Sequence, residues 1–263
     1  MLYKKHKTEG IEVLSCTSSF RFKPHIHDSF VLWISGGCSE HYFVNGKSDI
    51  LSKGHISIFN PHVVHENSSC SEYGRDLRSF YIERSFLDSL SSQITDKDNV
   101  GFSISQCIQK DRALFNNLLL LHDFLLQNNS ETESALYDIL SEFVVRYGEN
   151  INEKIFKGND DKRIRLSIEY MNDKFDEKIS VQELAKLVNC STFHLIKYFK
   201  NKKGLTPHAY LIQIRLEKAK NMINQGEKLS DIALNCGFSD QSHLSRNFKA
   251  RYGITPKKYS RLS

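Results

Sequence analysis

The sequence predicts an α+β protein of two domains: an N-terminal antiparallel β-barrel with flanking helices, and a C-terminal all-α domain with two helix-turn-helix motifs. Two observations lead to this prediction. Residues 11–82 contain short runs rich in Val, Ile, Phe, Tyr and Trp, which are typical of strands, whereas residues 160–263 contain one helical motif twice. A chain of 263 residues is long enough for two domains, each with its own core.

The N-terminal runs are short and regularly spaced, as in a small antiparallel barrel or jelly roll. Asn45-Gly46, between two of these runs, is a strong signal for a type I′ hairpin. The predicted strands cover residues 11–15, 29–35, 41–44, 50–51, 56–59 and 78–82.

Two helices are predicted after the barrel, at 111–127 and 131–147. Their leucines recur at helical spacing over a wider surface than the cover of one barrel face needs. The polar stretch that follows, with Gly158 and Asn159, is typical of a linker. We therefore place an N-terminal domain at 1–150, a linker at 151–162 and a C-terminal domain at 163–263.

The repeat in the C-terminal domain appears when the sequence is shifted by 49 positions, which aligns His194 with His243, Phe199 with Phe248 and Pro207 with Pro256. In each copy a short amphipathic segment precedes a tight connection and a basic helix, which is the order of a helix-turn-helix. Ser191 or Thr192 can cap the first basic helix, and Ser239 or Asp240 the second. Gly204 and Gly253 are expected to end these helices, and each precedes a Thr-Pro pair. A helix from about 208 to 224 joins the two units and is long enough, at roughly 25 Å, to hold two DNA-reading helices about one turn of DNA apart.

Charge supports the same division. Residues 160–263 carry 20 Lys and Arg against 11 Asp and Glu, whereas residues 1–159 carry 16 against 20. Only the C-terminal half therefore suits a phosphate backbone. Lys200, Lys202, Lys203, Lys249 and Arg251 are the expected phosphate contacts.

Six cysteines, at positions 16, 38, 70, 107, 190 and 236, lack the close spacing of a zinc or redox pair. The first ten residues are charged and have no apolar stretch, so no secretory signal and no membrane span are expected. These features predict a cytoplasmic protein.

The C-terminal half resembles the AraC/XylS family of bacterial transcription regulators. The resemblance rests on residues 184–207, on Arg215-Leu216 with Ala219, and above all on the run from Asp231 to Lys249 followed by Gly253-Ile254-Thr255-Pro256. It implies a transcription regulator that binds double-stranded promoter DNA, forms a homodimer, contacts RNA polymerase and acts as an activator. It implies that the exposed sides of both basic helices meet base edges, through Phe193, Ile196, Lys197, Gln241, Ser242, Ser245 and Arg246. Together with Lys200 and Lys249, which are expected on phosphate from their charge, these are the predicted DNA-binding residues.

The N-terminal half resembles the cupin-type barrel that precedes the DNA-binding half in this family. The carriers are Pro24-His25-Ile26-His27, Gly36, Asn45-Gly46, Gly54 and Asn60-Pro61 with His65. The family resemblance also implies that the helices at 111–147 form a subunit contact, although internal packing of the same stripe stays open. The residues expected in that contact are Leu114, Leu118, Leu121 and Leu125.

The histidines of the barrel allow two interpretations. His25, His27 and His65 could supply three nitrogens to a metal, as in metal-binding cupins. The carboxylate that those cupins add is missing, because Val31-Leu32-Trp33 occupies its region. No metal, cofactor or enzyme activity is therefore predicted.

The histidines and nearby aromatic rings are instead expected to line a pocket for a small-molecule effector, although the same rings could simply fill the core. The expected effector-binding residues are His25, His27, Trp33, Tyr42 and His65. Two alternatives remain: a regulator that has no small-molecule effector and is controlled by abundance or a protein partner, and a metal-binding cupin enzyme tethered to DNA.

Overall fold

The computed structural model describes residues 2–8, 10–44, 47–95, 101–104, 108–127, 132–150 and 159–262. The predicted Asn45-Gly46 turn lies outside these residues. The strands on either side of it, β5 (Glu40–Val44) and β6 (Lys47–Leu51), pair antiparallel with Val44 opposite Lys47.

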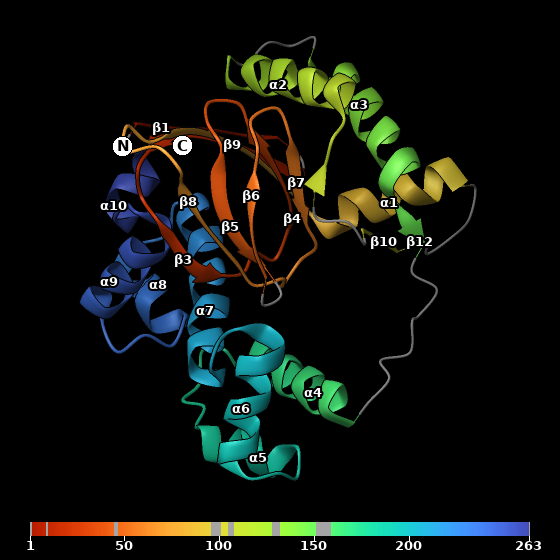
Figure 1. Ribbon diagram of the computed structural model, residues 1–263. Coiled ribbons are helices and arrows are strands. Elements are labelled where there is room, and N and C mark those ends of the chain that lie inside the picture. Colours follow the sequence, from red (N-terminus) through yellow and green to blue (C-terminus); the bar gives the residue numbers. More distant parts are fainter. Residues whose placement is uncertain are drawn as a thin grey trace.

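Two antiparallel sheets form the N-terminal domain (Figure 1). The larger sheet has the order β1-β2-β9-β4-β7-β11 and the smaller sheet has the order β3-β8-β5-β6. The bounds of the other strands in these sheets are β1 (Leu2–Thr8), β2 (Ile11–Ser18), β3 (Phe22–His25), β4 (Phe30–Ser35), β7 (Ile56–Phe59), β8 (His65–Ser69), β9 (Arg75–Ile82) and β11 (Ile108–Gln109). A separate short pair joins β10 (Phe102–Ser103) to β12 (Glu149–Asn150).

Strand β4 shows how the larger sheet is covered on both faces. All six of its residues are buried. Val31 and Trp33 pack between the two sheets, whereas Leu32 and Ile34 belong to a second apolar cluster beneath the helices. Because successive side chains point to opposite faces, a strand covered on both faces becomes an unbroken apolar run.

Three helices cover the outer face of the larger sheet: α1 (Arg84–Thr95), α2 (Arg112–Leu126) and α3 (Thr132–Tyr147). Asp111 caps α2 by accepting a hydrogen bond from the amide of Leu114, and its carboxylate also binds Arg146 and Tyr147 of α3. The sequence did not predict α1, which buries only Leu87, Leu90 and Ser91.

The leucines expected at a subunit contact lie inside the protomer. Leu114, Leu118, Leu121 and Leu125 are at most 5% exposed and pack on the sheet. The interpretation of this stripe as an interface is therefore wrong for these side chains, because the sheet face needs the stripe as cover. The exposed apolar residues of α2 are Leu120 and Phe124, on its other side.

The C-terminal domain contains two helix-turn-helix units joined by one long helix. The first unit is α5 (Val181–Leu187) and α6 (Thr192–Lys203), and the second is α8 (Leu229–Asn235) and α9 (Gln241–Tyr252). The connecting helix α7 runs over Pro207–Asn224. The remaining elements are α4 (Asn159–Asp173), α10 (Pro256–Tyr259) and the 3₁₀ turn η1 (Ser260–Leu262). Helix α4 begins inside the predicted linker.

The predicted N-terminal caps and C-terminal glycines of α6 and α9 are present. Ser191 caps α6 and Asp240 caps α9 through their side chains, and Gly204 and Gly253 end the same helices in the left-handed conformation. At these two glycines φ is 70° and 76°, values that a residue with a Cβ adopts only with strain.

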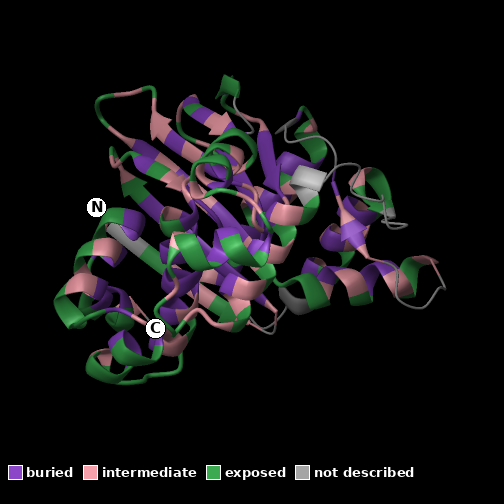
Figure 2. Cartoon of the chain, turned by 90° about the horizontal axis from the view of Figure 1, so that it is seen from below, coloured by how far each residue is buried: buried purple, intermediate pink, exposed green. Residues whose placement is uncertain are grey.

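The barrel and the second helix-turn-helix unit share one apolar core. A single cluster of buried residues contains Leu14 and Trp33 of the barrel together with Phe238, Phe248 and Tyr259 of the C-terminal domain. The two chain ends lie side by side because β1, which the sequence did not predict, contacts η1 (Figure 1). Buried residues continue from the sheets into the helices packed against them (Figure 2).

Candidate DNA-binding surface and barrel cavity

Helix α6 buries one side and exposes the other. Leu195 and Phe199 are fully buried and fix the helix on its domain. Phe193 is 70% exposed, Lys197 and Lys200 are exposed, and Ile196 is half-buried. The residues expected to contact DNA therefore lie on the free side, with Ile196 at its margin.

Helix α9 repeats this arrangement. Leu244 and Phe248 are fully buried, whereas the residues of α9 that are expected to contact DNA are accessible. Those side chains are Gln241, Ser242, Arg246 and Lys249, which are exposed, and Ser245, which is half-buried. The accessible side of α9 is polar and basic, and the first turn of α9 has no acidic residue. Such a face can donate hydrogen bonds to bases and phosphates in the major groove.

Arg215 of α7 lies between the segment that precedes α5 and the turn of the second unit. Its Nε donates to the carbonyl oxygen of Phe175 at 2.7 Å, and its Nη2 donates to that of Glu177 at 2.7 Å. Gly237, in the turn of the second unit, has φ of +70°, and a Cβ there would lie 2.8 Å from Arg215 Nη2. The close approach of the turn to Arg215 therefore requires glycine.

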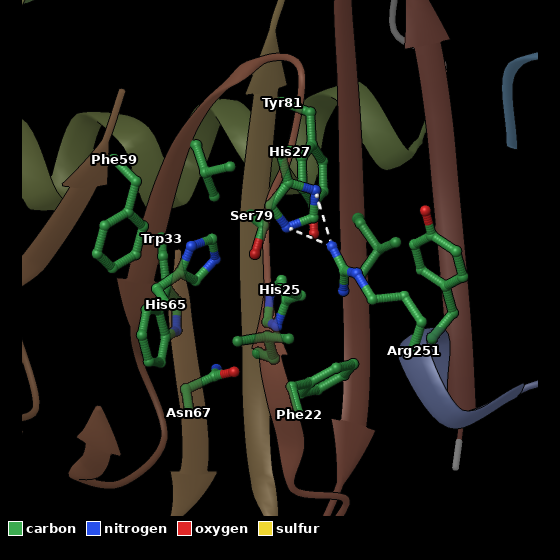
Figure 3. A pocket seen from close by; sticks show the side chains of 14 residues that line it. Phe22, His25, His27, Trp33, Phe59, His65, Asn67, Ser79, Tyr81 and Arg251 are labelled. Carbon is green, nitrogen blue, oxygen red and sulfur yellow. Dashed lines mark hydrogen bonds between the residues drawn. The ribbon is translucent and has the colours of Figure 1, made fainter. Parts of the chain in front are cut away.

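A small cavity of about 30 Å³ lies between the two sheets at the end that faces the C-terminal domain (Figure 3). Four of the five expected effector residues line it: His25, His27, Trp33 and His65. The fifth, Tyr42, does not line this cavity and instead borders a separate surface groove with Arg21 and Glu66. The cavity has room for only a few water-sized molecules.

The three cavity histidines come from β3, from the loop after it, and from β8, and they are at most 6% exposed. One nitrogen from each ring lies within 4.8 Å of the others. Burial lowers the pKa of His25 and His27 well below its usual value, with Arg251 adding to the effect, and lowers the pKa of His65 to about 4. All three rings are therefore neutral at pH 7.

Hydrogen bonds fix the orientation of two of these rings. Nδ1 of His25 lies 2.6 Å from the carbonyl oxygen of Lys23, and Nδ1 of His65 lies 2.9 Å from that of Val63. A carbonyl oxygen only accepts, so in each neutral ring Nδ1 carries the proton and Nε2 carries a lone pair.

Arg251 of α9 closes the cavity from the C-terminal domain (Figure 3). Its Nη2 donates to the carbonyl oxygen of Ile26 at 3.0 Å and lies 3.1 and 3.2 Å from the two ring nitrogens of His27. Our prediction that Arg251 contacts DNA phosphate is wrong for this arrangement, because the side chain is only 4% exposed. It lies two residues after the exposed Lys249, a rotation of about 200° around the helix, and therefore points away from the exposed basic face.

Buried charges on α7 complete the contact between the domains. Lys220 Nζ lies 3.1 Å from the carboxylate of Glu12 on β2, which also accepts from the hydroxyl of Tyr259 at 3.1 Å. Glu217 accepts from Tyr252 at 2.9 Å and lies 3.4 Å from Nδ1 of His27. Sequence reasoning missed this network. Its only signal was the i, i+3 spacing of two charged residues on one face of a long helix.

Within the described residues, no helix is long and apolar enough to cross a membrane. The five cysteines in that part of the chain are free thiols.

Two family models match this chain. One, described as the AraC-like ligand binding domain, matches residues 12–143, which is half of the chain. The other, described as a helix-turn-helix domain, matches residues 184–262.

Curated relatives are transcription regulators. The uncharacterized HTH-type transcriptional regulator YbfI of Bacillus subtilis is 25% identical over 227 residues, which cover 85% of this chain and 82% of YbfI. The HTH-type transcriptional activator RhaS of Klebsiella pneumoniae is 33% identical over 100 residues, which cover 38% of this chain and 36% of RhaS.

Solved structures share the fold over nearly the whole chain. An apo ToxT variant from Vibrio cholerae aligns with a TM-score of 0.63 at 15% identity, over 98% of this chain and 99% of ToxT. ToxT with a bound unsaturated fatty acid aligns with a TM-score of 0.61 at 14% identity, over 96% and 94% of the two chains. The matched ligand-binding and helix-turn-helix domains, in this order, show that the chain belongs to the AraC family of DNA-binding transcription regulators.

Proposed function

We propose that this regulator is a homodimeric activator that reads promoter DNA with α6 and α9 and is controlled by a signal at the barrel cavity. One observation supports this coupling above all others. Arg251 and Tyr252 of the DNA-reading helix α9 form part of the cavity wall, so a change in the cavity also changes the contacts that position that helix on the barrel. The activity requires no catalysis, and RNA polymerase is the expected partner at the promoter.

The DNA-reading roles follow from exposure and chemistry. Arg246 and Gln241 are suited to bidentate contacts with guanine and adenine, and Ser242 and Ser245 can contact either. Lys197 is the counterpart of Arg246 on α6, with Phe193 and Ile196 in reach of a thymine methyl group. Lys200 and Lys249 contact phosphates and position both helices.

The signal enters at His25, His27, Trp33 and His65, with Tyr42 at the neighbouring groove. A ligand shifts transcription only if it binds one arrangement of the two domains more tightly than the other. The dimer contact uses the exposed side of α2, where Leu120 is 56% and Phe124 is 45% exposed. The competing proposal is a barrel that binds no small molecule and is controlled by abundance or a protein partner.

DNA binding is tested by footprinting the full chain on genomic fragments recovered with it from cells. We expect two protected patches about one helical turn apart for each chain. The affinity should fall steeply with salt: a plot of the logarithm of the binding constant against the logarithm of the salt concentration should have a slope of about −0.9 for each phosphate contact. Salt-independent binding, or a single patch, would contradict the two-helix interpretation.

The sensing role is tested by promoter output in cells that express Trp33→Ala, with Leu32→Ala as its matched control. The two residues are neighbours on β4, and both are at most 2% exposed, but only Trp33 lines the cavity. Output is compared at equal protein abundance. We expect the response to the inducing condition to change in Trp33→Ala and to stay in Leu32→Ala, and an equal change in both would contradict the proposal.

A further inference from the structure

The histidine cluster has the chemistry of a metal site. His25, His27 and His65 are neutral and buried, and one nitrogen from each lies within 4.8 Å of the others. Three imidazole nitrogens with a water in the fourth position form a complete coordination set for zinc, and imidazole also suits nickel, copper and iron. A further carboxylate, whose absence argued against a metal in the sequence, is not needed for such a set.

Two of the histidines have the outer hydrogen-bond partner that metal-bound histidines have, and the third has a carboxylate nearby. The carbonyl oxygens of Lys23 and Val63 hold the Nδ1 protons of His25 and His65, so their Nε2 lone pairs are available. The carboxylate of Glu217 lies 3.4 Å from Nδ1 of His27, within reach of a proton on that nitrogen. Carbonyl or carboxylate partners of this kind fix the tautomer and raise the basicity of a ligating imidazole.

A cation already occupies the edge of this cluster. The Arg251 guanidinium places Nη2 3.1 Å from Nε2 and 3.2 Å from Nδ1 of His27, and so lies beside the position that a metal on this ring would need. All of its hydrogen bonds in the described structure come from this one nitrogen, and its buried Nε has no partner there. A guanidinium and a divalent ion also repel each other across a few ångströms of buried space. Arg251 and the ion therefore compete for one position.

The dimensions of the cavity favour an ion over an organic ligand. Its volume of about 30 Å³ is roughly a tenth of the smallest pockets that enclose drug-sized molecules. An ion with one water fits. Ligand nitrogens around tetrahedral zinc lie ~3.4 Å apart, from Zn–N distances of about 2.0–2.1 Å, so the three rings draw together around it.

We propose that His25, His27 and His65 bind one divalent first-row transition metal ion, and that this ion displaces Arg251 of α9 from the cavity. The proposal rests on the sensing role given to the barrel above and names the class of ligand. The displaced side chain no longer ties the end of α9 to the barrel. By linkage, whatever weakens the docking of Arg251 must tighten the binding of the metal.

Binding is measured on the full chain, stripped with chelator, by titration with Co²⁺ followed through its visible ligand-field absorption, and by competition with Zn²⁺. We expect one ion per chain. His65→Gln should abolish the absorption, whereas His41→Gln, which alters an exposed histidine on β5, should leave it unchanged. Circular dichroism of each variant checks that it is folded.

The decisive variant is Arg251→Met, which keeps an unbranched apolar stem and removes the guanidinium and its charge. We expect it to bind the ion at least about tenfold more tightly, within the usual range of coupling between two sites. Hydrogen exchange at the end of α9 should rise when Zn²⁺ is added to the wild-type chain. The proposal is overturned if neither chain binds one ion, if the two histidine variants lose the ion equally, or if Arg251→Met binds no more tightly.

This outcome is independent of the sensing test. If no ion binds but Trp33→Ala still loses its response, the barrel remains the sensor and only the metal is wrong. If the ion binds as expected while Trp33→Ala and Leu32→Ala respond alike, the metal site stands and the sensing role falls.

Discussion

Arg246 and Lys249 lie on the same exposed side of α9 but have different chemistry. The guanidinium of Arg246 can bind a guanine edge with two hydrogen bonds, whereas the ammonium of Lys249 acts as a point charge in the basic last turn. Arg246→Ala should therefore cost roughly 1 to 3 kcal/mol on the cognate site and relax preference at one base pair. Lys249→Ala should weaken all sequences alike. Competition binding with cognate and scrambled duplexes measures both effects, and equal losses on the two duplexes would reduce Arg246 to a phosphate contact.

Two glycines separate the effects of backbone strain and steric contact at single positions. Gly226 and Gly237 both have positive φ, at +81° and +70°. A Cβ added at Gly226 would have no neighbour within 4 Å, whereas a Cβ added at Gly237 would lie 2.7 Å from the carbonyl oxygen of Asp176. Gly226→Ala should cost about 1 to 2 kcal/mol, the usual penalty of the left-handed region. Gly237→Ala should cost clearly more, because the turn must also move away from Asp176 and Arg215. Urea unfolding of the two variants provides the comparison, and equal losses would mean that the turn relaxes freely.

At the scale of elements, His122 links α2 to the larger sheet. Its Nε2 lies 3.0 Å from the carbonyl oxygen of Leu14, and the side chain is fully buried. Burial lowers the pKa of His122, the Leu14 carbonyl opposes this shift, and Arg78, Asp123 and Asp76 are the charged groups around it. The unfolded chain therefore binds a proton at a higher pH than the folded chain does.

Stability from His122 is thus complete above its unfolded pKa of about 6.5 and is lost as the pH falls below that value. His122→Gln keeps an amide N–H for the Leu14 carbonyl and removes the titration. We expect a lower unfolding midpoint at pH 7 than in wild type, but a smaller decrease between pH 7 and pH 5. Thermal unfolding at the two pH values measures this, and an unchanged decrease would show that His122 does not titrate in this range.

The sequence predicted elements best where local signals decide them. The caps at Ser191 and Asp240 and the stops at Gly204 and Gly253 follow from backbone hydrogen bonding within a few residues. Strand β1 and helix α1 were missed because each has few apolar residues and is held by its neighbours. The leucine stripe of α2 was assigned to the wrong surface because periodicity identifies a buried face but not what buries it.

At the scale of the whole molecule, the barrel contacts the C-terminal ends of both α6 and α9. Arg251 of α9 enters the cavity, and a Cβ on Gly204, at the end of α6, would lie 3.6 Å from Val64 of the barrel. Helices α6 and α9 are therefore positioned by α7 and by the barrel together. No local signal could predict this contact, since it joins residues more than 200 positions apart, such as Ile26 and Arg251.

The ion pair between Lys220 and Glu12 tests how strongly the domains are joined. Both side chains are 8% exposed, and the pair is embedded in the apolar core that the domains share. Removal of one partner leaves a buried charge, which typically costs 3 to 5 kcal/mol. Lys220→Met should therefore loosen the C-terminal domain from the barrel, whereas Lys228→Met, at an exposed position, should have little effect.

The single tryptophan makes this measurement direct. Trp33 lies in the barrel, so its fluorescence reports unfolding of that domain. The circular dichroism at 222 nm is dominated by helices. In the wild-type chain a shared core should make the two urea transitions coincide. In Lys220→Met the helical signal should be lost at a lower urea concentration than the fluorescence signal. In the double variant Lys220→Met with Glu12→Gln the two transitions should coincide again, because the unpaired carboxylate is gone. Coincident transitions in all three chains would mean that the ion pair contributes nothing to docking and that apolar contacts alone hold the domains.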